Sequence, residues 1–304
     1  MKKSRKHTII ILIVLGVVVL TAGGIYGYQR FASLSEKKLE TELPGKEGTL
    51  NVYYLDLGSG ASAVLAESNE KFMLIDGGSE ETADELIECL KSMGVERLEY
   101  VILSSYEDGR FPGAVEVMKE FEVSTILSPD YVQDSLAYED YQALLAEGNL
   151  EEIHPNAEEI YAFSNTFFTV VGPRKYGQGG SAANSLCIRL DFGETSFLFC
   201  GDSGREEQEE MAEADLADTE ETLKADVYFI SDADRVLEES FLNCVRPDYA
   251  VLSSGGELPD SVRSLLNERD VQLYQIDVDG HICAFSDGRS IVWEKRGEPK
   301  TDRQ

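Results

Sequence analysis

The feature that most constrains the fold is the alternation of short apolar runs with segments of helical periodicity. In residues 81–93, Leu86, Leu90 and Met93 fall on one helical face, and Gly94 follows as a stop. Further helices are predicted over 114–121 and 138–147. Period-two runs predict strands at 52–57, 63–66, 72–75, 100–103, 125–127, 167–171, 186–192, 195–200, 227–230, 249–253, 273–276, 282–285 and 291–293. Strands mixed with helices of this length indicate an α/β sandwich.

The N-terminus differs from the rest of the chain. Residues 1–7 carry four Lys and Arg side chains, whereas the segment from Thr8 to Tyr28 has no charge over 21 residues. As a helix this segment is about 31 Å long, enough to cross a bilayer. The positive-inside rule then predicts a single-pass protein of the cell membrane with a cytoplasmic N-terminus. A cleaved signal peptide is the alternative, because small residues lie near Ala22.

These features predict five parts. They are a cytoplasmic basic tail at 1–7, a transmembrane anchor at 8–28, a polar stalk at 29–48, an extracytoplasmic globular domain at 49–295 and a polar tail at 296–304. Within the domain, residues 205–221 contain nine acids and predict a solvated helix face, with a surface for cations or a partner as the alternative.

The charge balance restricts the partners. The chain has 27 Lys and Arg against 57 Asp and Glu, for a net charge of −30. Nucleic-acid binding gains its affinity from cations that neutralise phosphates, so a chain this acidic disfavours nucleic acid. We therefore expect the membrane, through the Thr8–Tyr28 anchor, and a protein at the cell surface as partners.

Several motifs resemble the metallo-β-lactamase superfamily, and in particular the soluble metallohydrolase domain of the ComEC competence-protein family. The resemblance covers the strand-and-turn segment 51–62, the Leu-Ile-Asp-Gly-Gly at 74–78, the loop at 101–114, the strand that ends in Gly201-Asp202, and the segment 223–227. It implies an αββα sandwich, in which two sheets lie between outer layers of helices, preceded here by one N-terminal transmembrane helix. It also implies a hydrolase site that binds metal.

The metal-ligand motifs of that family are degenerate in this chain. Where the family reads Thr-His-x-Asp-x-Asp-His, the corresponding positions hold Ser105, Glu107, Gly109 and Arg110, and its later His-His pair corresponds to Asp232 and Ala233. Asp202 is the one ligand position that is retained. A zinc site needs imidazole, thiolate or carboxylate ligands. The resemblance therefore implies a protein without a metal cofactor and without catalysis, acting by binding or scaffolding.

Two alternatives stay open. An active hydrolase with an oxygen-rich site would use the carboxylates of Glu107, Asp108, Asp202, Asp232 and Asp234. Hard carboxylates favour Mg²⁺, Mn²⁺ or Ca²⁺ over the Zn²⁺ of the family. The other alternative is a subunit of a membrane or DNA-uptake assembly, in which the fold is a platform.

Two pairs of residues are predicted to meet. Arg110 replaces a ligand and brings its own positive charge, so we expect it beside Asp202, because a buried carboxylate requires a counter-charge. The strands at 186–192 and 195–200 flank Gly193-Glu194, which suits a two-residue hairpin loop. That register places Cys187 directly opposite Cys200, and we expect two buried thiols there rather than a strained disulfide.

Overall fold

The computed structural model describes residues 48–58, 63–148, 150–177, 179–218, 221–231, 237–253 and 258–296. The predicted anchor and basic tail lie outside these residues, as do nearly all of the stalk and the tail after Arg296, the last residue of β15. The single-pass topology therefore stays a prediction. Among the described residues, none of the helices is both long and apolar enough to span a bilayer.

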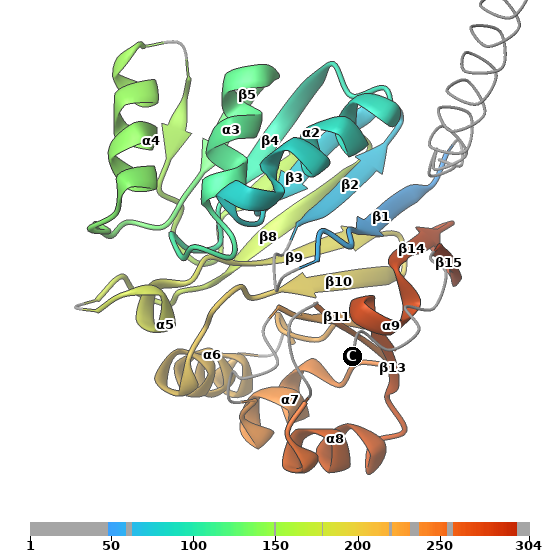
Figure 1. The fold of residues 1–304 in the computed structure, drawn as a ribbon. Helices are drawn as coiled ribbons and strands as arrows, with labels where there is room; N and C mark the ends of the chain where they lie inside the picture. The colour runs from blue at the N-terminus through green and yellow to red at the C-terminus, as the bar shows by residue number, and fades with distance from the viewer. Residues whose placement is uncertain are drawn as a thin grey trace, which may run out of the picture. The chain divides into compact units, whose positions relative to one another are not determined.

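The described strands form two mixed sheets (Figure 1). Sheet A has the order β15-β14-β1-β2-β3-β4-β5-β6. Its strands are β1 (Leu50–Tyr54), β2 (Val64–Ser68), β3 (Lys71–Ile75), β4 (Arg97–Ile102), β5 (Glu122–Leu127), β6 (Glu152–Ile153), β14 (His281–Ser286) and β15 (Ile291–Arg296). Sheet B has the order β13-β12-β11-β10-β9-β8-β7. Its strands are β7 (Ile160–Phe163), β8 (Thr166–Gly172), β9 (Cys187–Phe192), β10 (Thr195–Phe199), β11 (Val227–Ile230), β12 (Tyr249–Leu252) and β13 (Gln272–Gln275).

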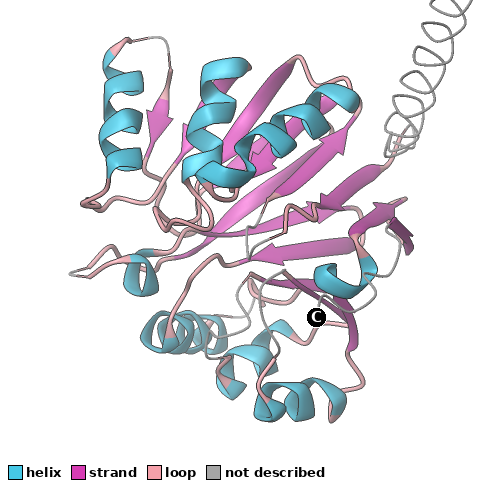
Figure 2. Ribbon diagram, in the orientation of Figure 1, coloured by secondary structure: helices cyan, strands magenta, loops and turns pink. Residues whose placement is uncertain are grey.

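Helices cover the outer faces of the two sheets, as Figure 2 shows. The described helices are η1 (Glu80–Thr82), α2 (Ala83–Ser92), α3 (Pro112–Glu120), α4 (Leu136–Ala146), α5 (Ser181–Asn184), α6 (Arg205–Ala217), α7 (Glu239–Val245), α8 (Asp260–Asn267) and α9 (Ile276–Asp279). One apolar cluster joins α2, α3 and α4 to sheet A, and another joins α6, α7 and α8 to sheet B. A third cluster lies between the sheets. The layers are those of the expected αββα sandwich.

The hairpin between β9 and β10 has the predicted register. Thr195 pairs with Phe192 and Phe199 pairs with Ile188, so the next pair along the ladder is Cys187 with Cys200. Cys187 Sγ lies 3.6 Å from the carbonyl oxygen of Cys200, and both thiols are free and buried. Burial raises the pKa of the Cys187 thiol, which favours its neutral form.

The acidic segment at 205–221 departs from the expected solvated face. It forms α6, but Glu207 and Asp215 are buried on the side that faces sheet B. Asp215 accepts hydrogen bonds from the backbone of Leu223 and the hydroxyl of Thr222, which ties the helix to the following turn. Glu207 points toward the backbone of Ser185. The predicted face is therefore only partly solvated, because two of its acids make internal contacts.

Candidate functional site

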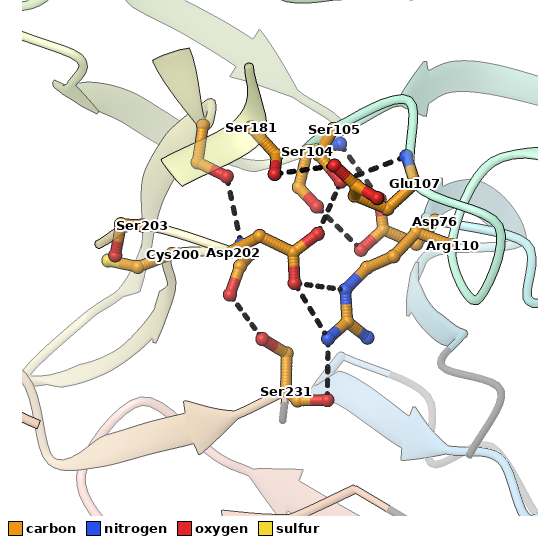
Figure 3. Close-up of polar contacts among 12 residues, drawn as sticks. Asp76, Ser104, Ser105, Glu107, Arg110, Ser181, Cys200, Asp202, Ser203 and Ser231 are labelled. Atoms are coloured by element: carbon orange, nitrogen blue, oxygen red, sulfur yellow. Dashed lines mark hydrogen bonds and ion pairs between the residues drawn. The ribbon is translucent and has the colours of Figure 1, made fainter. Parts of the chain in front are cut away.

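The site lies where parallel strands of both sheets end. In sheet A, β3 and β4 run parallel and are followed by the loops that carry Asp76 and Ser104–Arg110. In sheet B, β10 and β11 run parallel and are followed by Asp202 and Ser231. The turn after Asp76 packs directly on α3, where a side-chain carbon on Gly113 would overlap the backbone of Gly77. These loops meet in one polar cluster (Figure 3).

Arg110 lies at the centre of this cluster and connects the two sheets. Its Nε and its Nη2 each lie 3.0 Å from Asp202 Oδ1. Nη2 also donates to the backbone carbonyl of Ser231 at 2.7 Å. The other carboxylate oxygen of Asp202 accepts a hydrogen bond from Ser105 Oγ at 2.5 Å. Arg110 and Asp202 are 4% and 2% exposed, so the predicted pair is present and buried.

Asp76 supplies a second buried carboxyl to the site. Its Oδ1 accepts the backbone N–H of Ser104 and its Oδ2 accepts the Ser104 hydroxyl, each at 2.8 Å. Burial raises the pKa of Asp76 to about 7, against the opposing effects of the Arg110 guanidinium and the two Ser104 hydrogen bonds. Asp202 matches the positive charge of Arg110, whereas the raised pKa of Asp76 favours its neutral form more than in an ordinary carboxyl.

Glu107 joins the site loop to the segment that connects β8 and β9 in sheet B. Its Oε1 accepts a hydrogen bond from the hydroxyl of Ser181, the first residue of α5, at 2.7 Å. The adjacent Asp108 is exposed and Gly109 is half-buried, so neither approaches the cluster as Arg110 does. Of the carboxylates proposed for an oxygen-rich site, Asp232 and Asp234 lie outside the described residues, as does Ala233.

Hydrogen bonds that involve Ser185 and Glu207 support the backbone at Asp202. Its backbone N–H donates to the Ser185 hydroxyl at 2.8 Å, and the Ser185 N–H in turn donates to the carboxyl of Glu207 at 3.3 Å. Burial raises the pKa of Glu207 well above its ordinary value, and the neighbouring Cys187 adds to this effect. This shift favours the neutral form of Glu207.

The described residues do not fit the metal that this fold family binds. A ligand of zinc must direct a lone pair at the ion, and Arg110 offers only donors where the family has a histidine. The guanidinium lies against the carboxylate of Asp202. Among the described residues, there is also no group of three or more His, Cys, Asp or Glu arranged to hold a metal ion.

Some members of the cluster carry no signal that marks them in the sequence. Asp76 belongs to a motif that matched the family as scaffold, and its contact with Ser104 follows only from the parallel pairing of β3 and β4. Ser231 contributes a backbone carbonyl, which any residue type supplies. Ser181 reaches Glu107 across 74 positions of sequence, and nothing in the local pattern announces that contact.

Comparisons with solved structures found several similar proteins. YhfI, a metallo-β-lactamase fold protein from Bacillus subtilis, is 13% identical with a TM-score of 0.49, over 75% of this chain and 95% of its own. CmlA, a diiron β-hydroxylase from Streptomyces venezuelae, is 13% identical with a TM-score of 0.46, over 76% of this chain and 53% of its own. MEM-A1, a subclass B3 metallo-β-lactamase from a soil metagenome library, is 16% identical with a TM-score of 0.39, over 59% and 75%.

Assignment to a family rests on sequence rather than on these structural similarities. A search of curated proteins gave no match. Residues 57–256, well over half of the chain, match the model of the metallo-β-lactamase superfamily. The match includes the loops that carry Asp76, Arg110, Asp202 and Ser231, and the chain belongs to the metallo-β-lactamase superfamily.

Proposed function

We propose that this chain is a catalytically inactive member of the superfamily, of the type found in the soluble domain of ComEC proteins, and that it acts by binding or scaffolding. The buried contact between Arg110 and Asp202 is the observation that carries the proposal. The guanidinium supplies, from within the chain, the positive charge that Asp202 requires.

The electrostatics of the pair favour this conclusion. A divalent cation bound to Asp202 would lie within a few ångströms of a guanidinium that stays protonated at all ordinary pH values. At 4 Å, even unit like charges repel by about 4 kcal/mol at the effective dielectric constant of a site near a protein surface. Arg110 would have to leave the cluster for a metal to bind, and it would give up its contact with the Ser231 carbonyl as well.

The proposed setting is the outer side of the cell membrane. The basic residues before the uncharged Thr8–Tyr28 segment support an anchor with a cytoplasmic N-terminus and an extracytoplasmic domain. The net charge of −30 supports a protein partner over a nucleic acid, which separates the proposed role from DNA capture.

A hydrolysis assay tests the inactive state. The purified chain is incubated with phosphodiester and β-lactam reporter substrates, with Zn²⁺ or Mn²⁺ added, beside an Asp202→Ala variant. We expect the same background rate from both proteins, because no described group is placed to activate water at a metal. Metal-dependent turnover that is lost in Asp202→Ala would show an active hydrolase and refute the proposal.

A further inference from the structure

At the β7 edge, the described part of sheet B has fewer strands than the part of sheet A that it packs on. Tyr100 of β4 packs edge to face on Tyr161 of β7 and on Phe168 of β8, with ring centroids 6.4 Å and 5.2 Å away, so the β7–β8 end of sheet B lies over β4. Sheet A continues beyond β4 to β5 and β6, whereas no described strand of sheet B lies beyond β7. Thr125 of β5, which pairs with Tyr100, is half-buried as Tyr100 is. A strand added to β7 would lie over this ledge of sheet A.

The strand β7 lacks the devices that usually protect a sheet edge. Its sequence, Ile160 to Phe163, contains neither charge nor proline. Ile160 is 67% exposed, and the neighbouring Phe167 of β8 is 46% exposed. Among the other described edge strands, β15 ends in the charged run Glu294-Lys295-Arg296 and β6 has only two residues. Natural proteins blunt exposed edges in these ways, so an uncharged edge marks a place for pairing.

The backbone of β7 presents pairing groups on its outer edge. The backbone carbonyl of Glu159 accepts a hydrogen bond from the backbone N–H of Val170, so this carbonyl points toward β8. The direction of the backbone groups alternates from one residue of a strand to the next. Ile160 and Ala162 then direct their backbone groups away from β8. The hydroxyl of Tyr100 donates to the outward carbonyl of Ala162 at 3.1 Å, which confirms that direction. An incoming strand has the remaining outward amides and carbonyls of this edge to pair with.

The surroundings of this edge are acidic. Burial raises the pKa of the Tyr100 hydroxyl, and the nearby carboxylates of Glu99 and Glu151 raise this pKa further. Glu159 lies at the start of β7, where it accepts the Tyr161 hydroxyl. Glu158 pairs with Arg174 at 2.6 Å and Glu99 with Lys71 at 2.9 Å, so these two acids are already matched. Glu151 and Glu159 leave a local negative potential.

We propose that the outer edge of β7 binds an extended segment of a partner protein by strand addition, and that this segment alternates apolar with polar residues and is flanked by Lys or Arg. Main-chain hydrogen bonds hold such a segment, and alternate side chains select it. Its apolar side chains pack beside Ile160 on one face, and its polar side chains lie over Tyr100 and Thr125 on the other. Its cations face Glu151 and Glu159. The proposal concerns a surface away from Arg110 and holds whether or not that site is catalytic.

A second copy of this chain is the weaker occupant of the same edge. Two copies that each carry a net charge of −30 repel one another, and the acids around β7 would be brought together. A basic strand is attracted by the same charges. Its binding is therefore expected to weaken as salt is raised, whereas the apolar and main-chain contacts persist.

The test uses the full chain and a library of fluorescent peptides with alternating Val and Thr, flanked by either Lys or Glu, in an anisotropy titration. We expect Lys-flanked peptides to bind and Glu-flanked peptides to fail. Ala162→Pro removes an outward N–H while staying compatible with an edge strand, and it should weaken binding by about tenfold or more. Ile160→Glu should weaken binding without touching the backbone. Leu216→Glu alters an equally exposed apolar residue on α6 and should bind as the unaltered chain does.

Two sets of results would overturn the proposal, once a control for folding is in place. Thermal unfolding of the variants shows that a loss of binding does not reflect a loss of fold. If none of the Lys-flanked peptides binds, or if they bind Ala162→Pro and Ile160→Glu as well as the unaltered chain, β7 is not the docking edge. If light scattering shows a dimer that Ala162→Pro dissociates, the edge pairs with a second copy and the partner segment is excluded.

Discussion

Arg110 meets Asp202 across the two sheets, with its Nε and Nη2 both 3.0 Å from one carboxylate oxygen and both side chains almost fully buried. The contact joins a loop that follows β4 in sheet A to a turn that follows β10 in sheet B. In this chain a side chain makes the connection.

The first prediction concerns the stability that this pair confers. Arg110→Ala leaves Asp202 buried without its counter-charge and should lower the free energy of unfolding by on the order of 1–3 kcal/mol. Urea unfolding at pH 7 measures the change. Arg97→Ala is the matched control, because Arg97 and Glu122 form a pair of the same length with both side chains more than half exposed. Its cost should stay within about 0.5 kcal/mol. Equal costs for the two variants would show that burial adds nothing to the Arg110 pair.

The second prediction is a pH dependence that Asp76 causes. Its pKa of about 7 in the fold lies above that of an ordinary carboxyl, so the folded state holds the proton more tightly than the unfolded state does. The stabilisation is complete at low pH, declines as pH rises from about 4, and is lost above about 7. Asp76→Asn does not titrate and keeps an acceptor for Ser104.

Unfolding of both proteins between pH 5 and pH 8 checks this sign. The unaltered chain should lose stability relative to Asp76→Asn as pH rises, by at most about 1.4 kcal/mol per pH unit. Comparison of the two proteins cancels the general effect of the other acids. A stability difference that is constant with pH, or that changes in the opposite direction, would contradict the raised pKa.

The third prediction concerns the adjacent thiols on β9 and β10. Mild oxidation of the folded chain should link Cys187 to Cys200 before any other pair of its five cysteines, because the ladder places these two opposite one another. Mass spectrometry of the digested protein identifies the linked peptides. The reaction should be slow, since burial raises the pKa of the Cys187 thiol. A first link that involves Cys89 or Cys283 would contradict this order.

The fourth prediction is the membrane topology. With Thr8–Tyr28 as an uncleaved anchor and a cytoplasmic N-terminus, protease added to intact cells should remove the globular domain, and the full chain should stay with the membrane fraction. N-terminal sequencing of the mature protein provides the control for processing. Protection of the domain from protease, or a mature N-terminus close to Gly24, would contradict the anchor.

Burial and turn chemistry explain which elements were predictable from the sequence. The four residues of β11, Val227–Ile230, are all buried, and the predicted bounds are those observed. The β9–β10 register follows from a two-residue loop at Gly193-Glu194. By contrast, β7 was not predicted, because it is four residues long and half exposed. The short helices α7 and α8 were likewise missed, since each spans only about two turns.

Some contacts of the candidate site were also predictable from the sequence and others were not. Arg110 and Asp202 were predicted to meet because each occupies a family ligand position and their charges are opposite. Ser231 contacts Arg110 through its backbone carbonyl, and Asp76 contacts Ser104 in the loop after β4. No sequence pattern predicts either contact. Glu207 looked like one acid among nine on a solvated face, and only the packing of α6 places it beneath Asp202.

The metal content of the purified chain tests the central claim most directly. The chain and the Asp202→Ala variant are each incubated with excess zinc or manganese and desalted. Elemental mass spectrometry then measures the metal bound per chain. If Arg110 occupies the place of the metal, both proteins retain far less than one ion per chain. Retention of about one or more zinc ions per chain, lost in Asp202→Ala, would show a metal site and contradict the account.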